Sequence, residues 1–413
     1  MTIIKWEARS RRARAFAAVG VTMALVLGAC AIGPGDSGGG SPGATDGGEP
    51  VGGGEPSGVL NFTNWPLYID DDGEGNRPTI DQFEEETGID VTYSEAIQDN
   101  SSFFGTIQPQ LEAGQDPGHD IIVVTDWMIG NMIELGYLEQ IDVDRDIPNF
   151  MANAADKYKD RSYDPGNLYS VPWQSGITGI GYNPALVDEE ITSLAQLFDP
   201  EFIQKYCGQI GMFSEMRDVI SLALLYNGVI PEEATIEDVE AAQEVLLEQA
   251  ECVRGYYGNE YADDFANGSL AITMAWSGDV FQLQLDNPDL QFVVPDEGAI
   301  LWTDNMAIPK GAEHPDDALA MMDYVYRPEV AAQIAEWVNY ITAVPGAQEL
   351  VTQHADEAEA EGDTETADYL RTVAESPLVF PTDDMLSRLY SYKVLDEDEE
   401  RQWAELFQEV TQG

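Results

Sequence analysis

The chain has 413 residues, which is long for one ordinary domain, and 44% of them are hydrophobic, enough to build packed lobes. Its 76 acidic residues face only 19 Lys plus Arg, giving a net charge of -57 at pH 7. This balance argues against a nucleic-acid partner, because phosphate binding needs clustered cations. The acidity has two interpretations that composition does not separate: a heavily solvated, salt-adapted surface, or a field that concentrates a cationic ligand.

Residues 1–30 have the pattern of a lipoprotein signal peptide. Five cations before residue 15 precede an apolar run from Ala15 to Leu27, which ends in the lipobox Leu27-Gly28-Ala29-Cys30. The run is shorter than the about 20 apolar residues of a membrane-spanning helix. We therefore expect lipidation of Cys30 and an anchor on the outer face of the cell membrane. Ser10-Arg11-Arg12 leaves the choice between the general and the twin-arginine export routes open.

The next segment, residues 31–57, is rich in Gly, Pro and Ser and is predicted to be a flexible tether. After Cys30 the chain has only Cys207 and Cys252. In an oxidising compartment these two are a candidate disulfide, the alternative being two buried thiols. They lie in no CxxC motif and the three histidines are scattered, so we expect no metal site and no cofactor.

Beyond the tether, short apolar strands alternate with helical stretches, which predicts α/β layering. The predicted strands are 59–63, 89–93, 120–124, 270–275 and 291–294. The predicted helices are 80–87, 129–135, 219–226, 235–250, 315–326 and 329–338, with capping boxes at Thr79…Gln82 and Thr235…Asp238. The acidic stretch 355–375 is expected to be a solvated helix or an excursion from the fold, without chemistry.

One acidic loop approximates the spacing of a calcium-binding loop, with Asp70, Asp72, Glu74, Gly75 and Asp81. Pro78 falls inside it and an Asp stands where the final Glu is usual. A solvated turn is the preferred interpretation.

Four segments carry aromatic residues, carboxylates or both: Asn64-Trp65-Pro66-Leu67-Tyr68, Thr125-Asp126-Trp127, Glu215-Met216-Arg217-Asp218 and Trp302-Thr303-Asp304. Most follow a predicted strand or open a helix, and Trp276 and Tyr340 also lie at element ends. Ligands of open α/β sheets gather at the carboxyl ends of strands, so we expect these residues to converge. Carboxylates and ring faces suit ammonium groups while apolar walls suit methylenes, which favours a polyamine ligand.

At these segments the chain resembles the spermidine/putrescine-binding proteins of ABC transporters. The matching stretches are 60–65, 169–173, 177–183, 301–309 and 327–331, in the same order and at similar spacing. The resemblance implies a two-lobed α/β periplasmic-binding-protein fold of type II, with the ligand cleft between the lobes. It places residues 58–180 plus 303–350 in one lobe, and residues 181–302 plus 351–413 in the other.

The resemblance also implies a role for each residue. Aromatic positions fall on Trp65, Tyr68, Trp127 and Tyr340, and a ligand-holding hydroxyl falls on Thr125. Two acids for one amine end fall on Glu215 and Asp218, rings along the methylenes on Trp276 and Trp302, and an acid near the hinge on Asp304. Pro66 and Leu67 replace more polar residues, so the particular amine stays open.

We therefore expect a monomeric lipoprotein that captures a polyamine and delivers it to the permease of an ABC importer. One alternative keeps the fold and binds another small solute, such as an oligosaccharide, a thiamine-like compound or a metal chelate. A second is a secreted glycoside hydrolase that uses Glu215 with Asp218 or Asp304 as its acid/base pair. The sequence has no nucleophile elbow, HExxH motif or phosphate loop, which argues against an enzyme.

Overall fold

The computed structural model describes residues 49–73 and 75–412. The expected signal peptide, the lipidation site at Cys30 and most of the tether lie outside the described residues.

One mixed sheet runs through the whole molecule in the order β2-β1-β3-β9-β4-β7-β5-β6. Its strands are β1 (Val59–Thr63), β2 (Asp90–Ser94), β3 (Ile121–Thr125), β4 (Ser170–Tyr182), β5 (Ile210–Phe213), β6 (Val253–Tyr257), β7 (Ile272–Trp276) and β9 (Ala299–Ala307). Three short strands join it at the side, namely β8 (Gln291–Val293), β10 (Ile341–Thr342) and β11 (Leu389–Tyr390).

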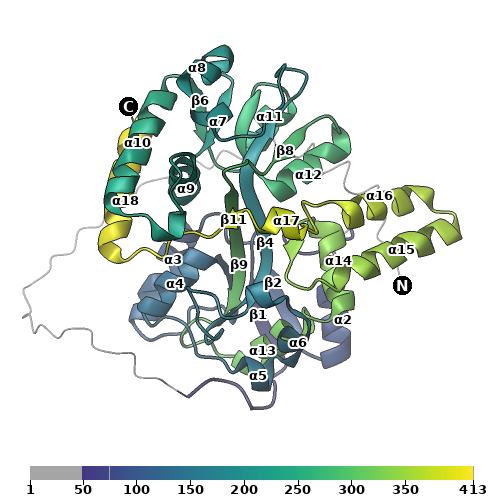
Figure 1. Ribbon diagram of the computed structural model, residues 1–413. Helices are drawn as coiled ribbons and strands as arrows, with labels where there is room; N and C mark the ends of the chain where they lie inside the picture. The colour runs from purple at the N-terminus through teal and green to yellow at the C-terminus, as the bar shows by residue number, and fades with distance from the viewer. Residues whose placement is uncertain (1–48, 74, 413) are drawn as a thin grey trace, which may run out of the picture.

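The long antiparallel pair β4 and β9 joins two lobes (Figure 1). Lobe 1 contains β1, β2 and β3, and lobe 2 contains β5, β6 and β7. The pairing runs from Ser170 opposite Ala307 in lobe 1 to Thr178 opposite Ile300 in lobe 2. Every residue of both strands is buried, so each strand stabilises the cores on both sides.

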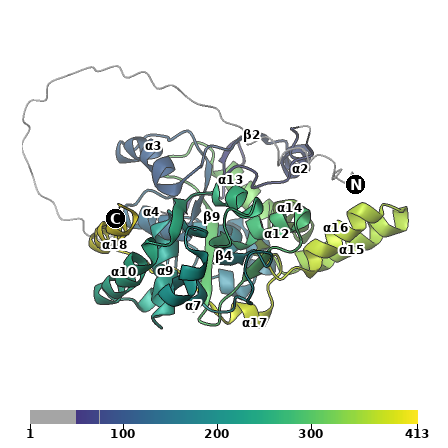
Figure 2. The same ribbon diagram turned by 90° about the horizontal axis from the view of Figure 1, so that it is seen from above.

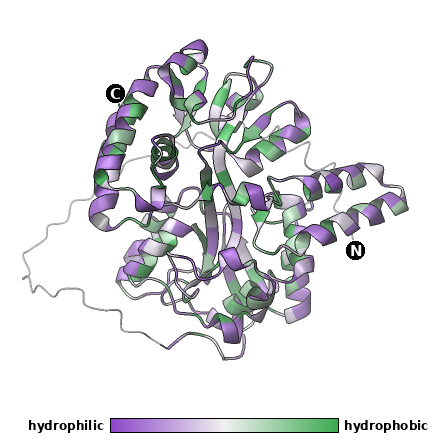
Figure 3. Cartoon of the chain, in the orientation of Figure 1, coloured by the Kyte–Doolittle hydropathy of each residue, from purple (hydrophilic) through white to green (hydrophobic). Residues whose placement is uncertain are grey.

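Helices cover the sheet in both lobes (Figures 1 and 2). They are α2 (Pro78–Thr87), α3 (Asn100–Glu112), α4 (Asp126–Glu134), α5 (Val143–Asp146), α6 (Pro148–Asn153), α7 (Ala195–Phe198), α8 (Pro200–Ile203), α9 (Met216–Tyr226), α10 (Ile236–Ala250), α11 (Tyr261–Ala266), α12 (Ser277–Asp286), α13 (Pro315–Tyr324), α14 (Pro328–Val338), α15 (Ala347–Glu361), α16 (Thr364–Glu375), α17 (Asp383–Leu386) and α18 (Glu397–Gln412). Figure 3 shows hydrophobic residues along the central strands, while the outer helices carry mostly hydrophilic residues.

The C-terminal segment is divided between the lobes, whereas the sequence placed all of 351–413 in lobe 2. Val351 and Val373 belong to the core of lobe 1, because α15 packs on α14 and α16 packs on α15. Trp403 and Phe407 of α18 belong to the core of lobe 2. The acidic stretch 355–375 is thus part of a helical hairpin that projects from lobe 1 in both views (Figures 1 and 2).

The end of the expected tether is packed along lobe 1. The backbone N–H of Gly54 donates to Asp316 Oδ1 at 2.8 Å, and those of Ser57 and Gly58 donate to the Asp317 carboxylate at 2.8 Å each. A Cβ on Gly54 would lie 2.6 Å from Asp316 Oδ2. A Cβ at this position would therefore require the Asp316 carboxylate to move. Residues 54–57, which were predicted to belong to the flexible tether, are held against lobe 1 by these hydrogen bonds.

Of the two predicted capping boxes, one is present in the structure and the other is not. The Thr235…Asp238 capping box of α10 is present with both reciprocal contacts. The Thr79…Gln82 box is wrong: α2 begins at Pro78 after Arg77, which makes no side-chain cap. The backbone N–H of Thr79 instead donates to Asp70 at 3.0 Å, since this buried carboxylate from the preceding loop supplies the acceptor.

Cys207 and Cys252 are joined by a disulfide in lobe 2.

The acidic loop uses its carboxylates for its own contacts. Asp70 Oδ2 also accepts Gln333 Nε2 at 2.8 Å, and Asp72 accepts the backbone and side-chain N–H groups of Asn76 at 3.1 and 2.6 Å. These bonds close the turn before α2. Glu74 lies outside the described residues.

Candidate ligand-binding site

The predicted site residues lie on elements that end where the two lobes meet. In lobe 1, Trp65 and Tyr68 follow β1, Thr125 ends β3, and Trp127 lies in the first turn of α4. In lobe 2, Glu215 is the N-cap of α9, Asp218 lies in its first turn, and Trp276 ends β7. Trp302 and Asp304 lie on the connecting strand β9, and Tyr340 lies between α14 and β10.

Asp304 is a buried carboxylate with a neutral donor. It lies opposite Thr125 in the pairing of β3 with β9, and Thr125 Oγ1 donates to Asp304 Oδ1 at 2.7 Å. Asn100 Nδ2 donates in turn to Thr125 Oγ1 at 2.8 Å and holds the hydroxyl in place. The Tyr68 hydroxyl faces the same carboxylate without reaching full hydrogen-bond geometry. Burial raises the pKa of Asp304 to about 6, against the opposing effect of the two hydroxyls.

A row of aromatic rings extends from this carboxylate, beginning with Tyr68. The Tyr340 ring meets the Tyr68 ring edge-on at 5.6 Å between centroids, and it lies 5.6 Å from the Trp302 ring. Trp302 rests on β4 at Gly176, where a Cβ would lie 2.2 Å from the indole ring. Trp65 is half-buried and is oriented by a 2.9 Å hydrogen bond from Nε1 to the Val123 carbonyl.

A second acid, Asp279 in the first turn of α12, was not among the predicted residues. It accepts hydrogen bonds from Tyr340 Oη at 2.8 Å and Tyr261 Oη at 3.0 Å, and burial raises its pKa. The Tyr261 hydroxyl also accepts the backbone N–H of Trp276, whose ring packs on Phe213 with centroids 4.4 Å apart. The sequence signal for Asp279 was its position three residues after Trp276. An acid at that position is equally explained by the favourable interaction of a negative charge with the start of a helix.

Glu215 and Asp218 form a third acidic group. Thr178 Oγ1 and Tyr392 Oη both donate to Asp218 Oδ1, at 2.5 and 2.7 Å. Burial raises the pKa of Asp218 to about 6. The pKa of Glu215 is raised to about 7 by burial first and then by the neighbouring charges of Asp218 and Asp99.

Trp127 packs against a cation of the protein itself. The Arg217 guanidinium of lobe 2 lies over its indole ring, 3.9 Å from the centroid. Arg217 is 9% exposed and also pairs with Glu400 of α18. One face of Trp127 is thus covered by a cation of the protein itself.

The three acidic groups have chemistry in common. Among the described residues, the donors that reach Asp304, Asp279 and Asp218 are hydroxyls, which contribute hydrogen bonds without neutralising the charge. No group of three His, Cys, Asp or Glu side chains in the described part of the chain could hold a metal ion. Two lobes joined by long strands, with acids and rings contributed from both sides, define a two-lobed solute-binding protein.

The comparisons with known proteins agree with this class. The family model of bacterial extracellular solute-binding proteins matches residues 79–362, and the chain belongs to this family. It is 26% identical over 370 residues to the putrescine-binding periplasmic protein SpuD of Pseudomonas aeruginosa, covering 86% of this chain and 92% of the relative. It is 30% identical over 295 residues to the spermidine/putrescine-binding periplasmic protein of Escherichia coli, covering 71% and 80%.

A solved structure gives the same result for the fold. The spermidine/putrescine ABC transporter substrate-binding protein PotD from Streptococcus pneumoniae, in complex with calcium and HEPES, superposes with a TM-score of 0.70 at 27% identity. The match covers 86% of this chain and 99% of that one.

The predicted family and two-lobed fold are confirmed. The chain is an extracytoplasmic substrate-binding component of transport and not an enzyme. In the described part of the chain, no helix has both the length and the apolar character of a membrane span.

Proposed function

We propose that this protein captures a polyamine between its lobes and delivers it to the permease of an ABC importer. The observation that carries the proposal is the set of buried carboxylates, Asp304, Asp279 and Asp218, whose partners are neutral hydroxyls. Buried charge without a counter-ion is costly, so the site is suited to a ligand that brings positive charge. The relatives named for putrescine and spermidine support the same class of ligand.

The energetics favour a ligand with amines at its ends and methylenes between them. A carboxylate–ammonium bond contributes about 1.5–3 kcal/mol, a cation–π contact about 0.5–2, and each buried methylene about 0.8. Association costs about 4–15 kcal/mol, so neither the charges nor the methylenes alone give tight binding. We assign the acids Glu215, Asp218, Asp279 and Asp304 to the amines. The rings of Trp65, Tyr68, Trp276, Trp302 and Tyr340 are assigned to the methylenes and cation faces.

Calorimetry on the mature domain tests the proposal. Putrescine, spermidine and spermine are titrated beside thiamine and a neutral oligosaccharide, which represent the alternative cargo. We expect heat with at least one polyamine and none with the oligosaccharide. Binding of the oligosaccharide or thiamine in the absence of any polyamine signal would refute the proposal.

The anchor and the oligomeric state belong to the same proposal. The lipobox at Cys30 supports attachment to the membrane by a lipid, with the protein acting as a monomer. A Cys30→Ala chain is expected to appear in the soluble extracytoplasmic fraction, while the unaltered chain is recovered with membranes. Sedimentation of the mature domain is expected to give the mass of a single chain, and a stable dimer would contradict this part.

A further inference from the structure

Arg217 stands between the two acids of the lobe 2 site in sequence, yet its guanidinium is bound elsewhere. Nη1 donates to Glu400 Oε1 at 3.2 Å and Nη2 donates to the second oxygen of the same carboxylate. The guanidinium plane rests on the Trp127 ring at 3.9 Å. Glu400 lies on α18, 183 residues further along the chain. This cation is thus held in place by the C-terminal helix of the chain and by a ring of the opposite lobe.

The position of Arg217 matters for the charge of its neighbours. It lies close enough to lower the pKa of both Glu215 and Asp218, although burial and, for Glu215, the charges of Asp218 and Asp99 keep those pKa values raised. A buried guanidinium without a counter-ion would turn to another carboxylate, since an arginine–carboxylate pair is among the strongest polar contacts. A pair between Arg217 and Asp218 would neutralise the charge that a ligand amine needs.

Asp218 makes no hydrogen bond to Arg217 among the described residues. Thr178 and Tyr392 occupy Oδ1, and no hydrogen bond reaches Oδ2 from the described residues. We propose that Glu400 is a positioning residue of the ligand site: it holds Arg217 on Trp127 and so keeps Glu215 and Asp218 unpaired for a cationic ligand. The proposal rests on the proposed polyamine function for its meaning in binding, but the arrangement of charges can be tested without ligand.

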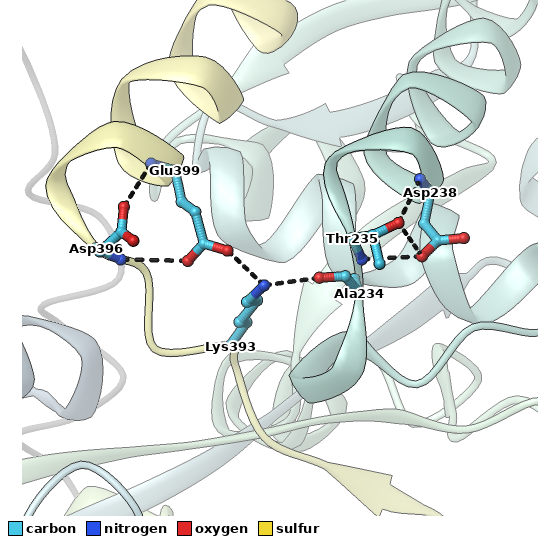
Figure 4. A network of polar contacts seen from close by, with 6 residues as sticks. All are labelled: Ala234, Thr235, Asp238, Lys393, Asp396 and Glu399. Carbon is cyan, nitrogen blue, oxygen red and sulfur yellow. Dashed lines mark hydrogen bonds and ion pairs between the residues drawn. The ribbon is translucent and has the colours of Figure 1, made fainter.

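The helix that carries Glu400 is itself firmly placed. Figure 4 shows that Lys393 Nζ, just before α18, donates to the Ala234 carbonyl at 2.7 Å and to Glu399 Oε1 at 2.6 Å. The backbone N–H of Glu399 donates to Asp396 at 2.9 Å (Figure 4). These contacts fix the start of α18 against the loop that precedes α10. Glu399 therefore offers a variant that loosens this attachment without touching Arg217.

The test uses Glu400→Gln, which keeps the shape of the side chain and removes its charge. In the ligand-free protein, carbon-detected NMR titration of Asp218 and Glu215 is expected to show lower pKa values, because Arg217 turns towards these acids. The other groups that face them are unchanged: Asp99 at Glu215, and the hydroxyls of Thr178 and Tyr392 at Asp218. With spermidine, calorimetry is expected to show affinity weaker by about tenfold or more, since an amine now competes with Arg217.

Three further variants separate this role from a merely structural one. Glu405→Gln removes one negative charge from an exposed position of the same helix, and Glu399→Gln loosens its attachment. Glu405→Gln is expected to leave the carboxyl pKa values of the site unchanged, whereas Glu399→Gln, which loosens the helix that carries Glu400, is expected to shift them less than Glu400→Gln does. In Arg217→Gln/Glu400→Gln the competing cation is gone, so spermidine affinity is expected to recover relative to the single Glu400 variant. Recovery distinguishes a displaced cation from a damaged helix.

Each outcome decides one of the two proposals. Unchanged pKa values in Glu400→Gln, the same shifts in Glu405→Gln, or no recovery in the double variant would overturn the role of Glu400. A wild-type protein that binds no polyamine would overturn the proposed function instead, while the ligand-free titration would still judge Glu400.

Discussion

Replacing Asp304 by asparagine is expected to weaken polyamine binding and, in the ligand-free protein, to raise the melting temperature. Both effects come from the same buried carboxylate, which is 5% exposed. Asparagine keeps an oxygen that can accept the Thr125 hydroxyl, now 2.7 Å from Asp304 Oδ1, but it carries no charge. The two effects have opposite signs because the ligand needs the charge and the empty fold is destabilised by it.

The magnitudes follow from the pKa and from the lost contact. Burial raises the pKa of Asp304 from 3.8 to about 6. At about 1.4 kcal/mol for each tenfold change, the ionised carboxyl destabilises the ligand-free fold by about 3 kcal/mol, an order-of-magnitude value. This cost is absent below about pH 4, where the group is neutral in both states, and is complete above about pH 6. Loss of an ammonium–carboxylate bond weakens binding by about 10- to 100-fold.

Two measurements check the reasoning. Thermal unfolding without ligand compares Asp304→Asn with wild type at about pH 7 and about pH 4, and the stabilisation is expected only at the higher pH. Calorimetry with spermidine gives the affinities, and wild-type affinity is expected to fall as the pH drops below about 6, where Asp304 and Asp218 become protonated. The exposed Asp263→Asn is the control for loss of one charge. Unchanged affinity in Asp304→Asn would remove this residue from the site, and a lower melting temperature at neutral pH would refute the burial argument.

Three further changes give distinct expectations. Tyr392→Phe removes one hydroxyl donor from Asp218, so the pKa of that acid is expected to rise further and spermidine affinity to fall several-fold by calorimetry, about 1 kcal/mol; an unchanged pKa would contradict the contact. Gly54→Ala places a Cβ 2.6 Å from Asp316 and is expected to speed amide hydrogen exchange of residues 51–58. The control Gly105→Ala, whose Cβ meets nothing within 4 Å, is expected to leave this exchange unchanged. Equal exchange in the two variants would refute the packing of Gly54 against Asp316. Cys207→Ser opens a disulfide between residues 45 apart and is expected to destabilise lobe 2 by about 3–4 kcal/mol in thermal unfolding; a melting curve equal to wild type would contradict this.

The sequence predicted those elements whose signals are local. The strand 59–63 and the helix 235–250 with its capping box were read correctly within a residue, because alternation and capping act over a few residues. The long strand β4 was not assigned, since it is buried throughout and shows no alternation, and it contains Pro172 and three glycines. The cap of α2 was wrong because a buried carboxylate from the preceding loop, Asp70, takes the place of a local cap.

The candidate site could be predicted where strand ends bring residues together. Thr125 and Asp304 meet because β3 and β9 are neighbours in the sheet, and both were identified from their positions at the ends or interruptions of apolar segments. Tyr392 was missed because its contact with Asp218 spans 174 residues and depends on how the C-terminal segment crosses back to lobe 2. For the same reason, nothing in the sequence indicated that Arg217 would cover Trp127, a ring that composition and position favoured as a ligand contact.

The charges of the site also bear on the two interpretations of the acidic composition. Contacts inside the site act at hydrogen-bond distance between buried groups, where salt screens weakly. The field of a surface with a net charge of -57 is instead screened beyond about 10 Å at about 0.1 M salt. If buried carboxylates such as Asp304 and Asp218 hold the ligand, added salt slows association of a polyamine while its dissociation rate stays nearly constant. The acidic surface would then act on the rate of association, while the buried acids, whose charge the hydroxyl donors leave unneutralised, would favour cationic over neutral solutes.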